Sequence, residues 1–242
     1  MKLVTFDVET SGVDTDNDRI ITCFMRAREG DEVVFEKNWV IDPGIEIPKE
    51  ASDVHGMTTE WIREHGRKDT GAAIREIASA LEGSSSNGFI IGGYNHSFDL
   101  SMLDAELQRH EETELRELLG PETHYIDPLA IDRGVDRYRR GSRKLMDVAK
   151  HYGIPVDESR LHEAEYDVEV TEKLIPKVLN KAWRSLAGER EGMSKDEFVT
   201  LLQGKQKGWK ARWAEGITAY FAKEGKTEDD GSPIIVSGAF PW

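Results

Sequence analysis

The sequence of 242 residues predicts an α/β fold in which a mixed central β-sheet is flanked by helices. Three strand-like runs come first in the chain, and helix-like runs then alternate with short apolar runs. This order of elements is typical of a layered α/β fold. The composition, 38% hydrophobic and 32% charged, is that of a globular protein. No apolar stretch approaches the roughly 20 residues that cross a bilayer.

The strand predictions depend on β-branched and aromatic residues. These are dense at 2–8, 19–28 and 32–41, and the polar sequence REGDE between the last two runs predicts a hairpin turn. The apolar run FIIGG is typical of a buried central strand, and THYIDPLAI predicts another short strand. Cys23 is the only cysteine, so no internal disulfide can form, and we expect its side chain to be buried.

The helix predictions depend on apolar residues at helical spacing. Residues 69–82 form one such run, which the sequence GSSSNG is expected to end. SFDLSMLDAELQRH and SRKLMDVAKHYGI predict two further helices. A fourth is expected from about residue 163 to about 182, with a kink or an early end at Pro176.

Two acidic residues share one face of the first predicted strand. Side chains alternate along a strand, so Thr5, Asp7 and Glu9 point one way while the apolar residues between them point into the core. Carboxylates held side by side repel each other, so either a cation lies between them or the strand ends in solvent. Bound cations would also mask part of the net charge of −14, which at long range opposes a nucleic-acid partner.

Three further sequences hold polar residues that can act with this pair. Asp99 is expected at the start of a helix, where an acid also favours the positive end of the helix dipole. His162 and Asp167 are five residues apart and cannot share a helix face, so a joint site requires His162 in the loop before the helix. His55 and Gly56, taken alone, form an ordinary turn.

The sequences FDVETSG, YNHSFDLSML and HEAEYD resemble, in this order, the three motifs of the DEDDh-type (DnaQ-like) 3′–5′ exonucleases. That family includes the proofreading epsilon subunit of bacterial DNA polymerase III, ribonuclease T and oligoribonuclease. IPKEASDVHGMT is similar to the family's segment ending in His-Gly-hydrophobic-Thr, and Glu163 stands where the tyrosine branch has its Tyr. The resemblance covers about residues 1–180 and implies a ribonuclease H-like fold.

The resemblance also implies the roles of five residues. Asp7, Glu9, Asp99 and Asp167 would bind two Mg²⁺ or Mn²⁺ ions, and His162 would be the general base. Residue types agree with these roles, because carboxylates suit hard cations and a histidine can take a proton from water near neutral pH.

Candidate substrate contacts follow from the same resemblance. Thr10, Ser11 and Met57 would flank the terminal nucleotide, or else they are turn residues and a packed methionine. Asn95 is a further candidate, although Tyr94 stands where the family often has His. Asp127 stands where the family often has a structural Asp followed by Thr. In this chain Pro128 replaces that Thr.

The sequence DRYRRGSRK is the densest basic run of the chain. Arg139 and Arg140 in this run would contact substrate phosphates. The alternative is a solvated loop.

We expect the exonuclease domain to span residues 1–182 and a helical extension of unknown role to span 183–242. Ser194 and Glu197 form a capping-box pattern that opens a helix. Trp209 and Trp213 lie on one helical stripe, which favours docking of this helix over base stacking. The apolar end IIVSGAFPW predicts a strand or a hook.

The expected function is that of a metal-dependent 3′–5′ exonuclease on single-stranded DNA ends. An RNA exonuclease of the ribonuclease T or oligoribonuclease kind, and a non-catalytic polymerase accessory module, are the alternatives. The expected partners are nucleic acid and a DNA polymerase acting in trans, with no membrane. We expect the protein to be cytoplasmic.

Overall fold

The computed structural model describes residues 1–111, 113–160, 162–228 and 231–242. A five-stranded sheet in these residues has the strand order β3-β2-β1-β4-β5. The first three strands pair antiparallel, whereas β1, β4 and β5 run parallel. The mixed sheet confirms the predicted fold class. The strands are β1 (Lys2–Thr10), β2 (Ile20–Glu29), β3 (Glu32–Val40), β4 (Ile90–Gly92) and β5 (Tyr125–Ile126).

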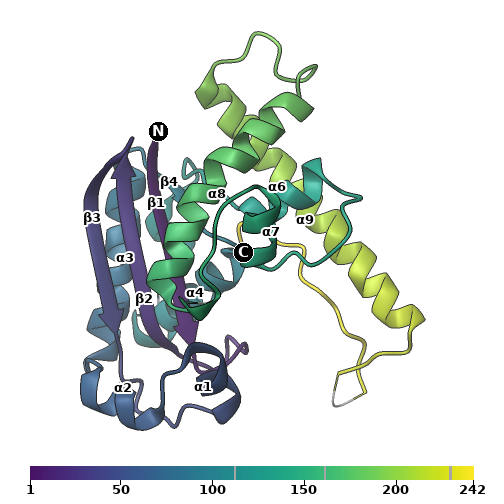
Figure 1. The fold of residues 1–242 in the computed structure, drawn as a ribbon. Coiled ribbons are helices and arrows are strands. Elements are labelled where there is room, and N and C mark those ends of the chain that lie inside the picture. The colour runs from purple at the N-terminus through teal and green to yellow at the C-terminus, as the bar shows by residue number, and fades with distance from the viewer. Residues whose placement is uncertain (112, 161, 229–230) are drawn as a thin grey trace.

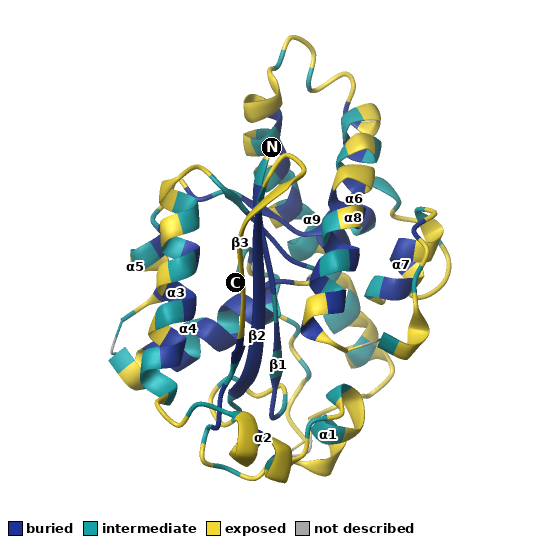
Figure 2. Ribbon diagram, turned by 60° about the vertical axis from the view of Figure 1, so that its left-hand side comes forward, coloured by how far each residue is buried: buried dark blue, intermediate teal, exposed yellow. Residues whose placement is uncertain are grey.

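Helices cover both faces of the sheet (Figures 1 and 2). One face is covered by α3 (Thr70–Ser86), α4 (Ser97–Glu111) and α5 (Leu115–Leu119). The other face is covered by α6 (Pro128–Val135), α7 (Leu145–His151) and α8 (Ala164–Ser185). Two short helices, α1 (Lys49–His55) and α2 (Thr59–His65), follow the hairpin. No helix in the described part of the chain is long and apolar enough to cross a membrane.

The two faces of β1 belong to different layers, as its sequence predicts. Val4, Phe6 and Val8 are buried in the core shared with α3 and α4. The opposite face lies against α8, so the buried Leu3 belongs to the second core. Asp7 and Glu9 therefore lie on the α8 side of the sheet. Cys23 is fully buried, as expected.

Two helices run further than the sequence predicts. α3 passes through GSSS to Ser86, where Ser84 Oγ donates to the carbonyl of Ala80 and keeps the serines compatible with a helix. α8 continues past Pro176 to Ser185. Pro176 is exposed, whereas Leu174, Ile175 and Val178 around it are buried in the second core, and this packing outweighs the missing backbone donor.

A single long helix, α9 (Lys195–Lys223), follows α8 and packs on α6 and β5 (Figure 1). The predicted capping box of Ser194 and Glu197 begins it. Gln206 is fully buried, accepting from Asp127 N (2.7 Å) and donating to Tyr125 O (3.0 Å). Gln203 Oε1 accepts from Tyr125 N at 2.9 Å. The extension therefore shares hydrogen bonds with the sheet, and the expected boundary at residue 182 remains a prediction.

Trp209 docks α9 against α6, as the predicted stripe requires. Its ring covers Gly134 so closely that a Cβ at position 134 would overlap it. The C-terminal segment is the predicted hook rather than a strand: Phe240 is buried against the ring of His96, and Trp242 packs edge-on against Tyr125.

Candidate active site

The carboxyl end of β1 and the start of α4 bring Asp7, Glu9 and Asp99 together. β4 pairs with β1 only from Leu3 to Thr5, so the later backbone groups of β1 on that side have no strand partner. The free N–H of Val8 donates to Asp99 Oδ1 at 3.0 Å. This buried bond holds the first turn of α4 beside the acidic pair.

α8 brings the fourth acid to the same place. Asp167 lies in the first turn of α8, which packs on β1. His162 precedes the helix with φ of 62° and is exposed, in the loop position that the spacing to Asp167 requires. The structure thus gathers the four predicted acids and places His162 at the entrance of the helix that carries the last of them.

Burial and mutual repulsion dominate the electrostatics of this acidic cluster, formed by Asp7, Glu9, Asp99 and Asp167. Burial and then the charges of the other three acids raise the pKa of Asp7 well above its ordinary value. The same two causes raise the pKa of Glu9 to about 8. Burial raises the pKa of Asp99 to about 7 against the opposing bond from Val8, and burial raises that of Asp167 to about 6. A cation bound beside these four acids would favour their ionised forms and lower their pKa values.

The residue types fit a hard divalent cation, although the side chains do not converge in a ligating arrangement. Among the described residues, no three His, Cys, Asp or Glu side chains lie close enough to hold a metal ion. Asp167 Oδ1 is buried without a hydrogen-bond partner in the described residues, so it has an oxygen to offer a ligand.

The raised pKa values predict that the metal-free protein loses stability as pH rises. An acid with a folded pKa above its unfolded value stabilises the fold at pH below both values, and this contribution disappears as pH rises through the folded pKa. For Asp167, the rise from 3.8 to about 6 corresponds to about 3 kcal/mol. We expect the thermal midpoint in EDTA to fall between pH 5 and pH 8, with a smaller fall in Mg²⁺. A midpoint in EDTA that rises over this range would contradict the repulsion.

His55 is a residue of this site that the sequence presents only as part of a turn. It ends α1, and its Nδ1 accepts from Met57 N at 3.1 Å. Burial lowers the pKa of His55, the backbone of Thr10 opposes this, and the charge of His162 adds to the lowering. His55 therefore lies near both the end of β1 and His162. In the sequence, only the similarity of His55 to the His of the family's His-Gly-hydrophobic-Thr segment indicates that it belongs to the site.

The side chains of Thr10 and Ser11 are engaged within their own loop. Thr10 Oγ1 donates to Gly12 O at 2.6 Å, and Ser11 Oγ donates to Asp18 Oδ1 at 2.8 Å. Met57 is half-buried against a small apolar cluster beneath α1 and α2. Thr10 and Ser11 follow Glu9 directly, and all three residues have the turn and packing roles that the sequence also allows. Substrate contact by any of them remains a prediction.

Asn95 adopts a left-handed backbone conformation (φ 58°), and its N–H donates to Asp127 Oδ1 at 3.0 Å. The Asn95 side chain is exposed beside the start of α4. Asp127 itself is buried. Burial would raise its pKa, but His96 and the N–H groups of Asn95 and Leu129 outweigh this and lower it. Asp127 is thus a structural acid that also accepts the first N–H bond of α6.

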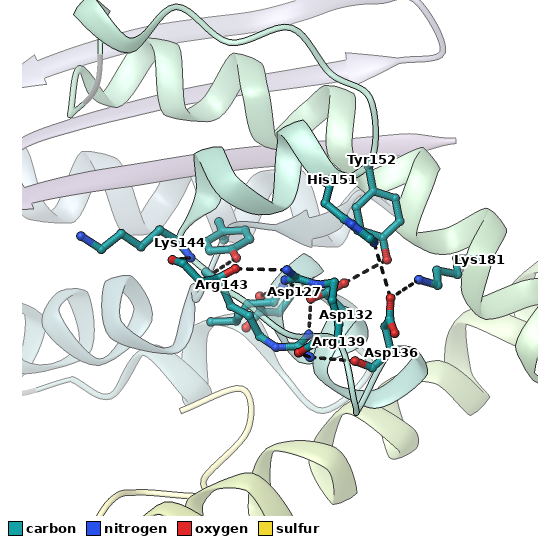
Figure 3. Close-up of polar contacts among 12 residues, drawn as sticks. Asp127, Asp132, Asp136, Arg139, Arg143, Lys144, His151, Tyr152 and Lys181 are labelled. Carbon is teal, nitrogen blue, oxygen red and sulfur yellow. Dashed lines mark hydrogen bonds and ion pairs between the residues drawn. The ribbon is translucent and has the colours of Figure 1, made fainter.

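The two arginines predicted to contact phosphates differ in their surroundings. Arg139 forms an ion pair with the buried Asp132 (2.9 Å), which also pairs with Arg143 (Figure 3). Arg140 is exposed. The structure therefore places Arg139 in an ion-pair network of α6 and leaves Arg140 the more accessible of the two.

Comparison with known proteins agrees with this geometry. A family model described as Exonuclease (RNase_T) matches residues 4–175. The DNA polymerase III PolC-type of Pediococcus pentosaceus is 28% identical over 171 residues, which cover 70% of this chain and 11% of the polymerase. That of Streptococcus mutans is 25% identical over 173 residues, with 71% and 11% covered. The chain thus spans about a tenth of the length of these relatives.

Solved structures share the fold. Escherichia coli exonuclease I in complex with a dT13 oligonucleotide matches with a TM-score of 0.63 at 18% identity, covering 78% of this chain and 43% of that chain. Exonuclease I from Methylocaldum szegediense matches with a TM-score of 0.61 at 19% identity, covering 88% and 46%.

Proposed function

Since the chain belongs to the DEDDh-type exonuclease family, we propose that it hydrolyses the terminal phosphodiester at the 3′ end of single-stranded DNA and releases nucleoside 5′-monophosphates. The acidic cluster is the observation that carries this proposal. A module that only bound nucleic acid would gain nothing from four clustered acids, because their charge repels phosphate. Similarity to oligonucleotide-bound exonuclease I supports DNA as the polymer.

Asp7, Glu9, Asp99 and Asp167 would hold two Mg²⁺ or Mn²⁺ ions. When bound, such ions polarise the phosphate and stabilise charge on the leaving 3′ oxygen. β1 fixes Asp7 and Glu9 on one face of a rigid strand, and the Val8 bond fixes Asp99 beside them. His162 would accept the proton of the attacking water, and its exposed loop position leaves its ring open to solvent and substrate.

A panel of substrates tests the proposal. The purified protein is incubated with 5′-labelled single-stranded DNA, duplex DNA and RNA, with Mg²⁺ or EDTA, beside Asp167→Ala. We expect shortening of single-stranded DNA from the 3′ end that both EDTA and the substitution abolish. Degradation that survives either one would refute the metal-dependent mechanism. Preference for RNA would favour the ribonuclease alternative, and binding without hydrolysis would favour the accessory module.

The similarity to PolC-type polymerases supports a setting in replication, and we propose a DNA polymerase as a partner. Co-purification of the tagged protein with a polymerase from its own source is the corresponding test. A stable protein that elutes alone at every salt concentration would argue against it.

His162→Asn is expected to lower the rate of hydrolysis by about 10²- to 10⁴-fold, because a positioned general base contributes this much. Binding of a single-stranded oligonucleotide in EDTA should be unchanged, since His162 is exposed and holds no part of the fold together. His65→Asn on α2 is the matched control, an exposed histidine outside the acidic cluster. Equal rates for His162→Asn and the control would exclude the proposed proton transfer.

A further inference from the structure

A basic pocket of about 640 Å³ lies between α6 and α9; α6 and the loop after it belong to the matched family region, whereas α9 lies beyond that region. Its lining in the described residues holds no carboxylate, although the chain carries a net charge of −14. Its volume is in the range of small-ligand sites. The side chains that give it its character are Arg133, Arg137, Arg143, Arg212, Trp209 and Trp213.

Arg133 is a half-buried cation that makes no ion pair in the described residues. Its guanidinium carbon lies 3.6 Å from the centroid of the Trp213 ring, and its Nε is buried without a hydrogen-bond partner in the described residues. Burial lowers the pKa of Arg133, the charge of Asp127 opposes this, and Arg143 adds to the lowering. A cation held in this way has bonding capacity for an anion.

Lys210 of α9 is a second half-buried cation, close enough to Arg133 for their charges to interact. Burial lowers its pKa, Asp127 opposes the change, and the charge of Arg133 contributes to it. The acids near this place are already engaged: Asp132 pairs with Arg139 and Arg143 (Figure 3), and Asp127 accepts backbone bonds. The positive charge of Arg133 and Lys210 is thus left without a direct ion pair in the described residues.

Docking of α9 does not account for the whole pocket. Trp209 covers Gly134 and Trp213 lies against Arg133, so both contact α6, whereas Arg212 is exposed further along the helix and lines the open space. An aromatic wall beside unpaired cations is the combination that binds a base together with its phosphate.

We propose that this pocket binds a nucleotide unit of the single strand whose 3′ end lies in the acidic cluster. The inference depends on the proposed function for the identity of the strand. It assigns the α9 extension a role in holding substrate upstream of the reacting end. The charge of the pocket is opposite to that of the acidic cluster, so the strand is attracted where the acids would repel it.

Binding of 5′-fluorescein oligo(dT) of 3 to 25 nucleotides, measured by anisotropy in EDTA, tests the inference. We expect wild-type affinity to increase once a strand is long enough to reach the pocket. Arg212→Glu should weaken binding of the long strands about tenfold and of the shortest less than twofold, with a smaller salt slope. Lys207→Glu makes the same charge change at an exposed position of α9 outside the pocket and should have no length-dependent effect.

Arg133→Lys and thermal midpoints serve as checks on folding, since Arg133 is part of the α6–α9 contact. Equal weakening at all lengths, or the same effect for Lys207→Glu, would overturn the proposal. So would a wild-type affinity for oligo(dT) that does not change with strand length. Length-dependent binding in a protein that hydrolyses no substrate would support the pocket and refute the proposed function, so the two failures are distinguishable.

Discussion

Asp7→Asn is expected to abolish hydrolysis and, in the same protein, to raise the thermal stability measured in EDTA. Asp7 has its pKa raised by burial first and then by Asp99, Glu9 and Asp167, so its charge costs free energy in the folded state. An amide of the same shape removes that charge and its repulsion of the neighbours. It also removes one of the proposed cation ligands, and we expect a loss of about 10³-fold or more in rate.

The two effects of Asp7→Asn are measured separately. Hydrolysis of labelled single-stranded DNA in Mg²⁺ gives the rate, and thermal unfolding in EDTA at pH 8 gives the stability, where a gain of about 1–2 kcal/mol corresponds to several degrees. Asp31→Asn in the exposed β2–β3 turn is the matched control and should change neither quantity. Lower stability with lost activity would mean that Asp7 is a structural residue rather than a strained functional one.

Gly134→Ala is expected to cost at least about 1–3 kcal/mol of stability, the usual range for overpacking. A Cβ at this position overlaps the ring of Trp209, which is held between α6 and α9 and cannot swing away without undocking the helix. We therefore expect faster hydrogen exchange along α9 as well as a lower thermal midpoint. Loss of docking would also free the bonds of Gln203 and Gln206 to β5.

Two variants make the Gly134→Ala result specific. Gly204→Ala lies inside α9 with nothing within 4 Å of its added Cβ, and it should stabilise the helix by about 0.5–1 kcal/mol. Trp209→Leu combined with Gly134→Ala should lose less than the sum of the two single changes, because a smaller side chain makes room for the methyl group. Additive losses would show that Trp209 is not what opposes the methyl group.

Local patterns predicted most of the sheet and the common face of Asp7 and Glu9, whereas the resemblance to the exonuclease motifs added Asp99 and Asp167 to the cluster. Alternation along β1 placed Asp7 and Glu9 on the face opposite Phe6, and the spacing of His162 and Asp167 required a loop residue followed by a helix residue. Both inferences depend on backbone geometry alone, which sequence spacing determines.

Long-range contacts account for what the sequence could not predict. A proline inside a helix predicts a kink or an end from local backbone chemistry alone. At Pro176 the burial of neighbouring side chains in the second core outweighs this effect, and the helix continues. Arg139 pairs with Asp132 because the loop after α6 folds back toward that helix. Nothing in the run DRYRRGSRK distinguishes Arg139 from Arg140. His55 reaches the site through the fold of α1, so its sequence neighbours show only a turn.

The bonds from Gln203 and Gln206 of α9 also affect the edge of the sheet at β5. A last strand normally offers a row of free N–H and C=O groups that another extended chain can pair with, which leads to strand exchange and aggregation. Gln203 and Gln206 occupy the outer groups of β5 with side-chain amides, which have the same donor and acceptor as a peptide group. On this side a helix imitates the missing neighbour strand, and the sheet is closed to further growth.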